Sequence, residues 1–218
     1  DAKISISGSN VSITPEVTGK HIDIEDLCNK IKESIDPNPE KVETATVDLQ
    51  DYSPSITSAD LSKITGVMSS YSSTFGTSDT GRVENLRIST GYINGTLLMP
   101  GEEFSYNNTI GPTTPERGYK EANTYVGSKI VPGYGGGVCQ VSSALYRAVI
   151  QANIRSTERR NHSMTVSYAK PGLDATVAAG YIDYKFVNTY DFPIYIQGYL
   201  SGNRVVFNIF GNKEAMNG

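Results

Sequence analysis

Apolar and polar residues alternate near both ends of the chain, as they do in half-buried β-strands. The segments 3–7 and 10–14 alternate around Gly8 and predict a hairpin. The segments 193–200 and 204–210 alternate in the same way and predict a second hairpin near the C-terminus. Shorter alternating or apolar segments predict further strands at 41–49, 64–75, 96–99, 103–106, 122–131 and 184–187.

Three other segments repeat their apolar residues every three or four positions, which is typical of amphipathic helices. Asp23 can cap a helix that runs to about Ile35, and Cys28 on this helix is expected to be a core residue. A second helix is predicted over 82–93, and a third begins at residue 138. The apolar face of the third helix consists of Val138, Val141, Ala144, Leu145, Ala148, Val149 and Ala152.

The order of these elements predicts an α+β fold in two domains. A small α+β module, 1–65, is expected to precede a larger α+β domain, 66–218. In the larger domain, an antiparallel sheet is expected to pack on the helix that begins at residue 138. A length of 218 residues is sufficient for such a division.

Cys139 lies in the first turn of that helix, directly after Gly135, Gly136 and Gly137. At about 100° per residue it lies roughly 140° from the centre of the apolar face, so the core does not require it. A thiol at a helix N-terminus meets unpaired N–H groups and the positive end of the helix dipole, and both favour the reactive thiolate. The alternative is a small buried residue that follows a tight glycine turn.

His162 is the natural base for Cys139, because the other histidine, His21, lies in the N-terminal module. A carboxylate should orient its imidazole, and the candidates are Asp174 and Asp183. We expect His162 on one strand and Asp174 at the start of the next, with the helix bringing Cys139 to both. Alternatively, His162 bonds a nearby carbonyl group and Asp174 caps a turn.

A metal site formed by Cys139, His162 and Asp174 is disfavoured, because these residues lack closely spaced ligand pairs. We therefore expect no metal ion and no cofactor. The neighbours predicted to bind substrate or to stabilise an oxyanion, together with the Cys139 N–H, are Gln140, Gly137, Ser142 and Tyr134.

Composition narrows the class of partner. A formal net charge of −4, with 19% charged residues, argues against binding to nucleic acid. No apolar run reaches about 18 residues, so membrane contact is expected only through a segment outside this sequence.

The sequence opens at Asp1, and an upstream export or anchor segment is expected to have been removed. Cys28 and Cys139 fall in different predicted domains, so a disulfide between them is not expected.

Five motifs occur in order at 100–107, 135–146, 160–168, 171–177 and 181–186, and through them residues 68–211 resemble the VanW family of bacterial envelope proteins. This resemblance implies a Gram-positive source and an association with vancomycin-resistance gene clusters. Through motifs at 13–20 and 52–57, the N-terminal module resembles a peptidoglycan-binding module found before L,D-transpeptidase and VanW domains. That resemblance implies peptidoglycan or wall peptides as the partner. It also implies an extracellular or envelope location, with the protein secreted or membrane-anchored.

Residues 137–154 also resemble the core helix of transglutaminase-like, papain-related cysteine enzymes. In those enzymes a Gly-x-Cys sequence opens a helix that precedes strands carrying His and Asp, and Cys139, His162 and Asp174 follow that order. The chain departs from many such cores because it contains no Trp. Together these features favour an exported thiol hydrolase or acyltransferase, namely an amidase, peptidase or transpeptidase acting on cell-wall peptides. The alternative is a non-catalytic protein that binds peptidoglycan or an envelope partner.

Overall fold

The computed structural model describes residues 1–34, 46–77, 79–126 and 129–217. Helices and antiparallel sheets both occur, which confirms the predicted α+β class. The predicted N-terminal hairpin forms from β1 (Lys3–Ser7) and β2 (Asn10–Thr14). The chain divides into two compact units, residues 1–4 with 13–61 and residues 5–12 with 62–218. The expected domain boundary after residue 65 stays a prediction.

The first unit contains helix α1 (Ile24–Ser34), which is capped as its sequence predicts. The Asp23 carboxylate accepts the backbone N–H groups of Glu25 and Asp26, each at 3.0 Å. The predicted core position of Cys28 is wrong, because α1 presents this residue to solvent. The strand predicted at 41–49 begins outside the described residues, and residues 46–49 form no strand. The other elements of this unit are α2 (Ser58–Leu61) and the antiparallel pair β3 (Gly19–His21) and β4 (Gln50–Tyr52).

The second unit is built on a four-stranded antiparallel sheet with the order β5-β13-β12-β6. The predicted C-terminal hairpin is present as β12 (Ile194–Ser201) and β13 (Arg204–Gly211). Strand β5 (Gly66–Thr74) pairs with β13, and β6 (Thr96–Leu98) pairs with β12. Alternate residues of β13 are fully buried, so one face of this sheet carries the core: Val205, Phe207 and Ile209.

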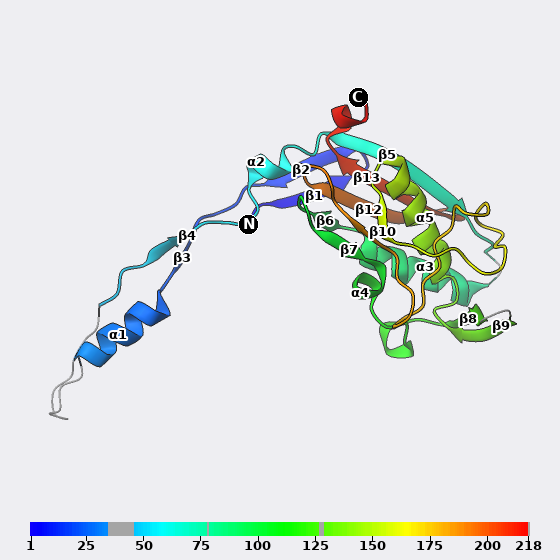
Figure 1. Cartoon of the computed structure of the whole chain (residues 1–218), viewed down its shortest axis with the longest axis horizontal. Helices are drawn as coiled ribbons and strands as arrows, with labels where there is room; N and C mark the ends of the chain where they lie inside the picture. Colours follow the sequence, from blue (N-terminus) through cyan, green and yellow to red (C-terminus); the bar gives the residue numbers. More distant parts are fainter. Residues whose placement is uncertain (35–45, 78, 127–128, 218) are drawn as a thin grey trace. The chain divides into compact units, whose positions relative to one another are not determined.

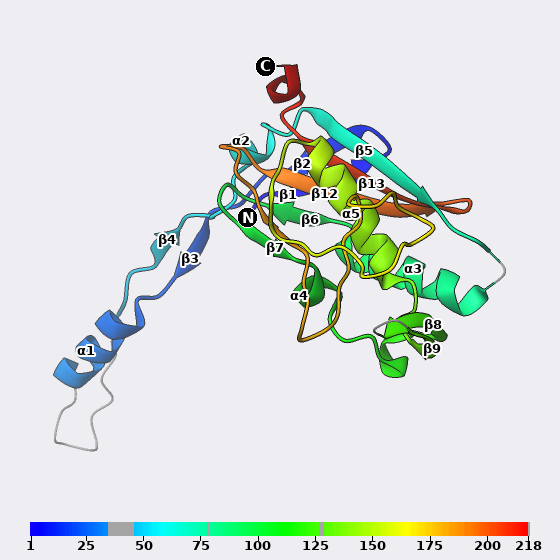
Figure 2. The same cartoon turned by 45° about the vertical axis from the view of Figure 1, so that its right-hand side comes forward.

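Two helices lie side by side over this sheet, as Figure 1 and Figure 2 both show. Helix α5 (Val138–Gln151) contacts β5 and β13, whereas α3 (Thr80–Ile93) contacts β12 and α5. The predicted apolar face of α5 is its buried face. Ser69 links the sheet to this helix by donating a hydrogen bond to the Ala148 carbonyl at 2.6 Å. The predicted packing of a central helix on an antiparallel sheet is therefore confirmed.

Several connecting segments differ from the predicted strands. The segment predicted as one strand at 122–131 is the hairpin β8 (Glu121–Val126) and β9 (Lys129–Tyr134). Strand β7 ends at Ser105, because the Ser105 side chain caps a short helix that follows it. The remaining elements are β7 (Glu103–Ser105), α4 (Tyr106–Ile110), β10 (Ser156–Glu158), β11 (Lys185–Val187), and the 3₁₀ helices η1 (Pro115–Arg117) and η2 (Lys213–Asn217).

The strands expected at His162 and Asp174 are absent. Between β10 and β11 the backbone forms only two isolated bridges, one of which joins Arg160 to Thr176. Side-chain hydrogen bonds, described below, hold this irregular segment against α5 in place of a strand ladder.

Candidate functional site

The glycine turn fixes where α5 begins. A Cβ atom on Gly136 would lie 2.7 Å from the carbonyl oxygens of Ala122 and Asn123, so only glycine lets the turn pack this closely against β8. Gly137 has a φ of 112°, in the left-handed region that favours glycine. The helix then starts at Val138, which leaves Cys139 in its first turn, as the sequence predicts.

His162 and Asp174 are direct neighbours. Nδ1 of His162 lies 2.5 Å from Oδ2 of Asp174, and the same oxygen accepts the His162 backbone N–H at 2.7 Å. An ionised carboxylate can only accept hydrogen bonds, so Nδ1 carries the proton. Arg159 holds this acid in place, because its Nε donates to the Asp174 carbonyl at 2.8 Å. The Asp174 and His162 side chains are almost entirely buried, at 5% and 6% exposed.

The competing acid, Asp183, has a different role. Its carboxylate accepts hydrogen bonds from the Ser105 hydroxyl at 2.6 Å and from the Asn107 N–H at 2.9 Å. These contacts fix the start of α4. Asp174, not Asp183, is the carboxylate that the structure brings to His162.

The thiol of Cys139 meets the other side of this pair. A side-chain hydrogen bond joins Cys139 to His162. Because Nδ1 faces Asp174, Nε2 is the imidazole nitrogen left for the thiol. The Tyr168 hydroxyl also lies 3.2 Å from Nε2. The Cys139 Sγ contacts the Val177 carbonyl oxygen at 3.5 Å and the Thr176 hydroxyl at 3.8 Å.

The balance of burial and hydrogen bonding shifts the pKa of each group towards its charged form. Burial raises the pKa of the Cys139 thiol, but hydrogen bonds with His162 and the Val177 backbone outweigh it and lower this pKa below its ordinary value. Burial lowers the pKa of His162, but hydrogen bonds with Cys139 and Asp174 raise it overall. Burial raises the pKa of Asp174, but hydrogen bonds from His162 lower it overall. The arrangement therefore stabilises a thiolate at Cys139, an imidazolium at His162 and a carboxylate at Asp174.

Ser142 does not have the expected role at the substrate. It is fully buried, and its hydroxyl donates to the Ala175 carbonyl at 2.7 Å. The neighbouring Ser143 hydroxyl donates to the Cys139 carbonyl at 2.7 Å and accepts the Ala175 N–H at 3.0 Å. The two serines thus fasten the segment that carries Asp174 to the first turns of α5.

The Gln140 side chain is also engaged elsewhere. Its amide nitrogen donates to the Ser73 hydroxyl at 2.9 Å and to the Thr74 carbonyl at 2.8 Å, and its amide oxygen accepts a hydrogen bond from Arg82 at 2.5 Å. It is 1% exposed, so the expected oxyanion contact from this side chain is wrong. The Cys139 N–H remains a candidate donor, because N–H groups in the first turn have no acceptor within the helix.

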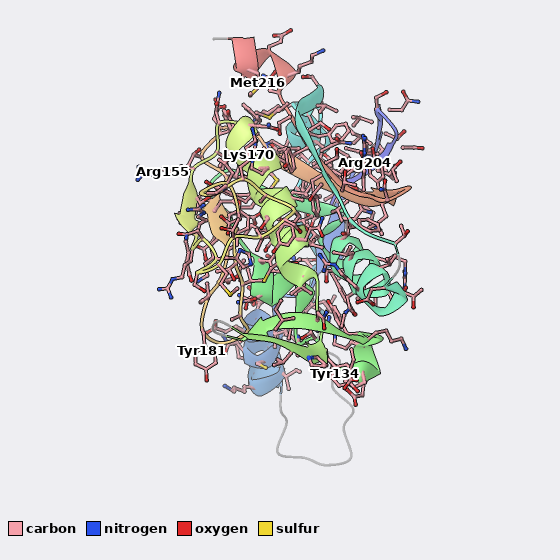
Figure 3. All side chains as sticks on the ribbon, turned by 90° about the vertical axis from the view of Figure 1, so that its right-hand side faces the viewer. Tyr134, Arg155, Lys170, Tyr181, Arg204 and Met216 are labelled. Carbon is pink, nitrogen blue, oxygen red and sulfur yellow. The ribbon has the colours of Figure 1, made fainter. Side chains whose placement is uncertain are left out.

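Cys139 and His162 open onto a cavity of about 950 Å³. Gly137 and Tyr134 line it, and their binding to substrate stays a prediction. Figure 3 shows Tyr134 on the strand that leads into α5. The residues that line the cavity and that the sequence analysis did not single out include Arg82, Arg160, Tyr168 and Thr176. Tyr168 and Thr176 lie within the motifs at 160–168 and 171–177, so the sequence could have suggested them as site residues. No sequence pattern suggested Arg82.

Three further observations concern metal binding, membrane crossing and the cysteines. Within the described ranges, no group of three His, Cys, Asp or Glu side chains is placed to hold a metal ion. None of the helices in the described part of the chain is long and apolar enough to cross a membrane. Both cysteines are free thiols.

Comparison with known proteins gives two family matches. The family described as "VanW like protein" matches residues 81–210, and the family described as "Putative peptidoglycan binding domain" matches residues 1–43. Over 175 residues the chain is 34% identical to the uncharacterized protein YoaR of Bacillus subtilis, which covers 80% of this chain and 57% of YoaR. Over 139 residues it is 28% identical to the vancomycin B-type resistance protein VanW of Enterococcus faecalis, which covers 61% of this chain and 50% of that protein.

The chain therefore spans about half the length of the curated relatives it matches. No solved structure matches it significantly.

Proposed function

Because the chain belongs to the VanW family, we propose that it is a cysteine-dependent enzyme of the bacterial cell envelope that acts on amide bonds of cell-wall peptides. The observation that carries this proposal is the hydrogen-bonded series of Cys139, His162 and Asp174 at a cavity. A nucleophile, a base and a group that orients the base are the parts that covalent acyl transfer requires.

The reaction begins with the Cys139 thiolate, whose proton has passed to Nε2 of His162. The sulfur attacks the carbonyl carbon of the scissile amide and forms a C–S bond, and the carbonyl oxygen becomes an oxyanion. The Cys139 N–H stabilises this oxyanion. As the C–N bond breaks, Nε2 gives its proton to the leaving amine, and a thioester remains on Cys139.

The second half of the reaction restores the enzyme. Water or an amine attacks the thioester carbonyl, Nε2 removes a proton from the attacking group, and the C–S bond breaks. Attack by water makes the protein an amidase or peptidase, and attack by an amine makes it a transpeptidase. Throughout, Asp174 keeps the Nδ1 proton in place, so that Nε2 faces the sulfur in the orientation that proton transfer needs.

Two observations support wall peptides as the substrate class. The cavity of about 950 Å³ is large enough for several residues of a peptide. The match of residues 1–43 to a peptidoglycan-binding family supports peptidoglycan as the partner of the first unit and the envelope as the location. The same match favours a second candidate function, in which the protein binds peptidoglycan without catalysis.

Purified peptidoglycan distinguishes the two functions. We expect the wild-type protein to release or exchange wall peptides, detected by mass spectrometry, and Cys139→Ala to lose this activity while still sedimenting with the wall. Cys28→Ala is the matched control, because this exposed thiol lies in the other unit, and it should keep both properties. Sedimentation of the wild type without any release or exchange would leave the binding function and reject the enzyme.

A further inference from the structure

Arg82 stands out among the charged residues of the cavity. The cavity is lined by Arg82, Arg160 and Asp79, in addition to Cys139 and His162. Asp79 acts as the N-cap of α3, where its carboxylate accepts the Arg82 backbone N–H at 2.9 Å. The side-chain partner of the Arg82 guanidinium, in the part of the chain that the structure describes, is a neutral amide.

That amide belongs to Gln140, whose oxygen accepts a hydrogen bond from Nη2 of Arg82 at 2.5 Å. The Gln140 amide nitrogen is itself held by Ser73 and Thr74 of β5. Through this chain of hydrogen bonds the sheet fixes the guanidinium in one place. A guanidinium has five N–H donors, and among the described residues Gln140 is the side chain that accepts from them, so other donors can face a ligand.

The guanidinium also lies against the glycine turn that precedes the nucleophile. A Cβ atom on Gly137 would be 2.6 Å from Nη1 of Arg82, and Gly137 precedes Cys139 by two residues. The cation is therefore packed against the turn that delivers the thiol. A partly buried cation without a carboxylate partner is costly, and an anionic ligand would offset that cost.

From this geometry we infer that Arg82 binds a carboxylate of the substrate close to the scissile carbonyl, so that the site selects peptides with a free carboxylate over their amidated forms. The inference rests on the proposed function for the identity of the substrate as a peptide. The planar fork of a guanidinium matches the two oxygens of a carboxylate. Gln140 is then a positioning residue, which explains why its side chain is buried behind Arg82 rather than directed at an oxyanion.

Iodoacetate and iodoacetamide form a matched pair of probes for this site, because both alkylate a thiolate and only iodoacetate carries a carboxylate. In a Cys28→Ser background, the ratio of their second-order rate constants at Cys139 reports attraction of the anion. A general change in the reactivity of the thiol alters both rate constants by the same factor, so it leaves their ratio unchanged. One charge-assisted hydrogen bond corresponds to about a tenfold or larger effect, so Arg82→Met should lower the ratio about tenfold.

Two variants serve as controls. Arg87→Met removes a cation from the same helix that is ion-paired with Glu84 at 2.6 Å, and it should leave the ratio within about twofold of the starting protein. Arg82→Lys keeps the positive charge but lacks the planar guanidinium, so its ratio should lie between those of Arg82→Met and the starting protein. A purely structural effect of losing Arg82 would not be reversed by lysine in this way. An unchanged ratio in Arg82→Met, or a fall seen only in Arg160→Met, overturns the inference.

Peptide pairs connect this result to the substrate. Wall peptides that differ only in a free or an amidated carboxylate should show a preference of about tenfold or more in kcat/KM for the free acid, and Arg82→Met should abolish it. Equal turnover of both peptides overturns the inference and leaves the proposed function intact. If the ratio of alkylation rates depends on Arg82 and no peptide is turned over, the proposed function fails and the carboxylate site stands.

Discussion

Oδ2 of Asp174 contacts His162 twice, at the ring nitrogen Nδ1 and at the backbone N–H. One carboxylate oxygen thereby fixes both the rotation of the imidazole and the position of the backbone that carries it. This double contact makes Asp174 the acid that orients His162, in spite of the irregular structure of the segment on which both residues lie.

Replacing this acid should cripple the reaction without unfolding the protein. In Asp174→Asn the amide no longer holds the Nδ1 proton by charge, so the ring loses its preferred tautomer. We expect release or exchange of wall peptides to fall about 10²- to 10⁴-fold, measured as kcat/KM. The pKa of His162, followed by NMR titration of the ring protons, should fall as well, because the hydrogen bond with Asp174 is one of the causes that raise it.

Asp183→Asn is the matched control for that change. Asp183 holds Ser105 and Asn107 at the start of α4, so its replacement should lower the melting temperature and leave the His162 titration unchanged. The opposite pattern, with the titration moved by Asp183→Asn alone, would assign the acid to Asp183.

Reactivity of the thiol should depend on pH in a defined direction. The pKa of Cys139 is lowered, so its thiolate persists as the pH falls below about 8.5, where an ordinary thiol becomes protonated. The rate of alkylation by iodoacetamide should therefore reach half its maximum below that pH. An ordinary thiol is about 3% ionised at pH 7, which limits the gain at that pH to about 30-fold.

His162→Ala should reverse this behaviour, because the hydrogen bond and charge of His162 are removed while the burial that raises the pKa remains. We expect the midpoint to move to higher pH and the rate at pH 7 to fall. The measurement uses a Cys28→Ser background, with Cys139→Ser to show that no other group reacts. A midpoint at or above that of an ordinary thiol in the starting protein would contradict the contacts described here.

The segment that carries Asp174 should loosen when its serine anchor is removed. The Ser143 hydroxyl donates to the Cys139 carbonyl and accepts the Ala175 N–H, and Ser143→Ala leaves the buried Ala175 N–H without this acceptor. We expect a loss of about 1–3 kcal/mol in the free energy of unfolding, measured by urea titration. Ser72→Ala, at an exposed position on β5, should change it by less than about 0.5 kcal/mol. Equal effects of the two changes would show that the anchor contributes nothing.

The parts of the fold that the sequence predicts are those whose burial is periodic and local. Helix α5 carries its apolar residues on one face, and the same face packs on the sheet. The C-terminal hairpin is predicted for the same reason, since β12 and β13 alternate and pair with each other. The proximity of Cys139 and His162 could be predicted from the sequence because the chain contains few groups able to form such a pair.

The errors fall where a distant partner decides the structure. Ser142 and Gln140 are polar residues beside a nucleophile, which suggested substrate contacts, yet both are buried by hydrogen bonds to segments more than 30 residues away. The segment around His162 alternates like a strand but is held by side chains such as Arg159 instead of a neighbouring strand. Cys28 lies on an amphipathic helix, yet its side chain is exposed. Periodicity carries no information on these partners.

The tight glycine turn before α5 offers a last test, on stability. In Gly136→Ala the new methyl group would lie 2.7 Å from backbone atoms of Ala122 and Asn123, which cannot move aside as a flexible side chain can. Either β8 or the start of α5 must shift. We expect a loss of about 1–3 kcal/mol in the free energy of unfolding, together with slower alkylation of Cys139, because the first turn of α5 moves with the glycine.

The matched change is Gly91→Ala on α3, where a methyl group meets open space and the helix gains about 0.5–1 kcal/mol. Urea titration of the two variants, with alkylation rates measured in parallel, compares them directly. If Gly136→Ala were as stable and as reactive as Gly91→Ala, close packing of this turn against β8 would not be what positions the thiol.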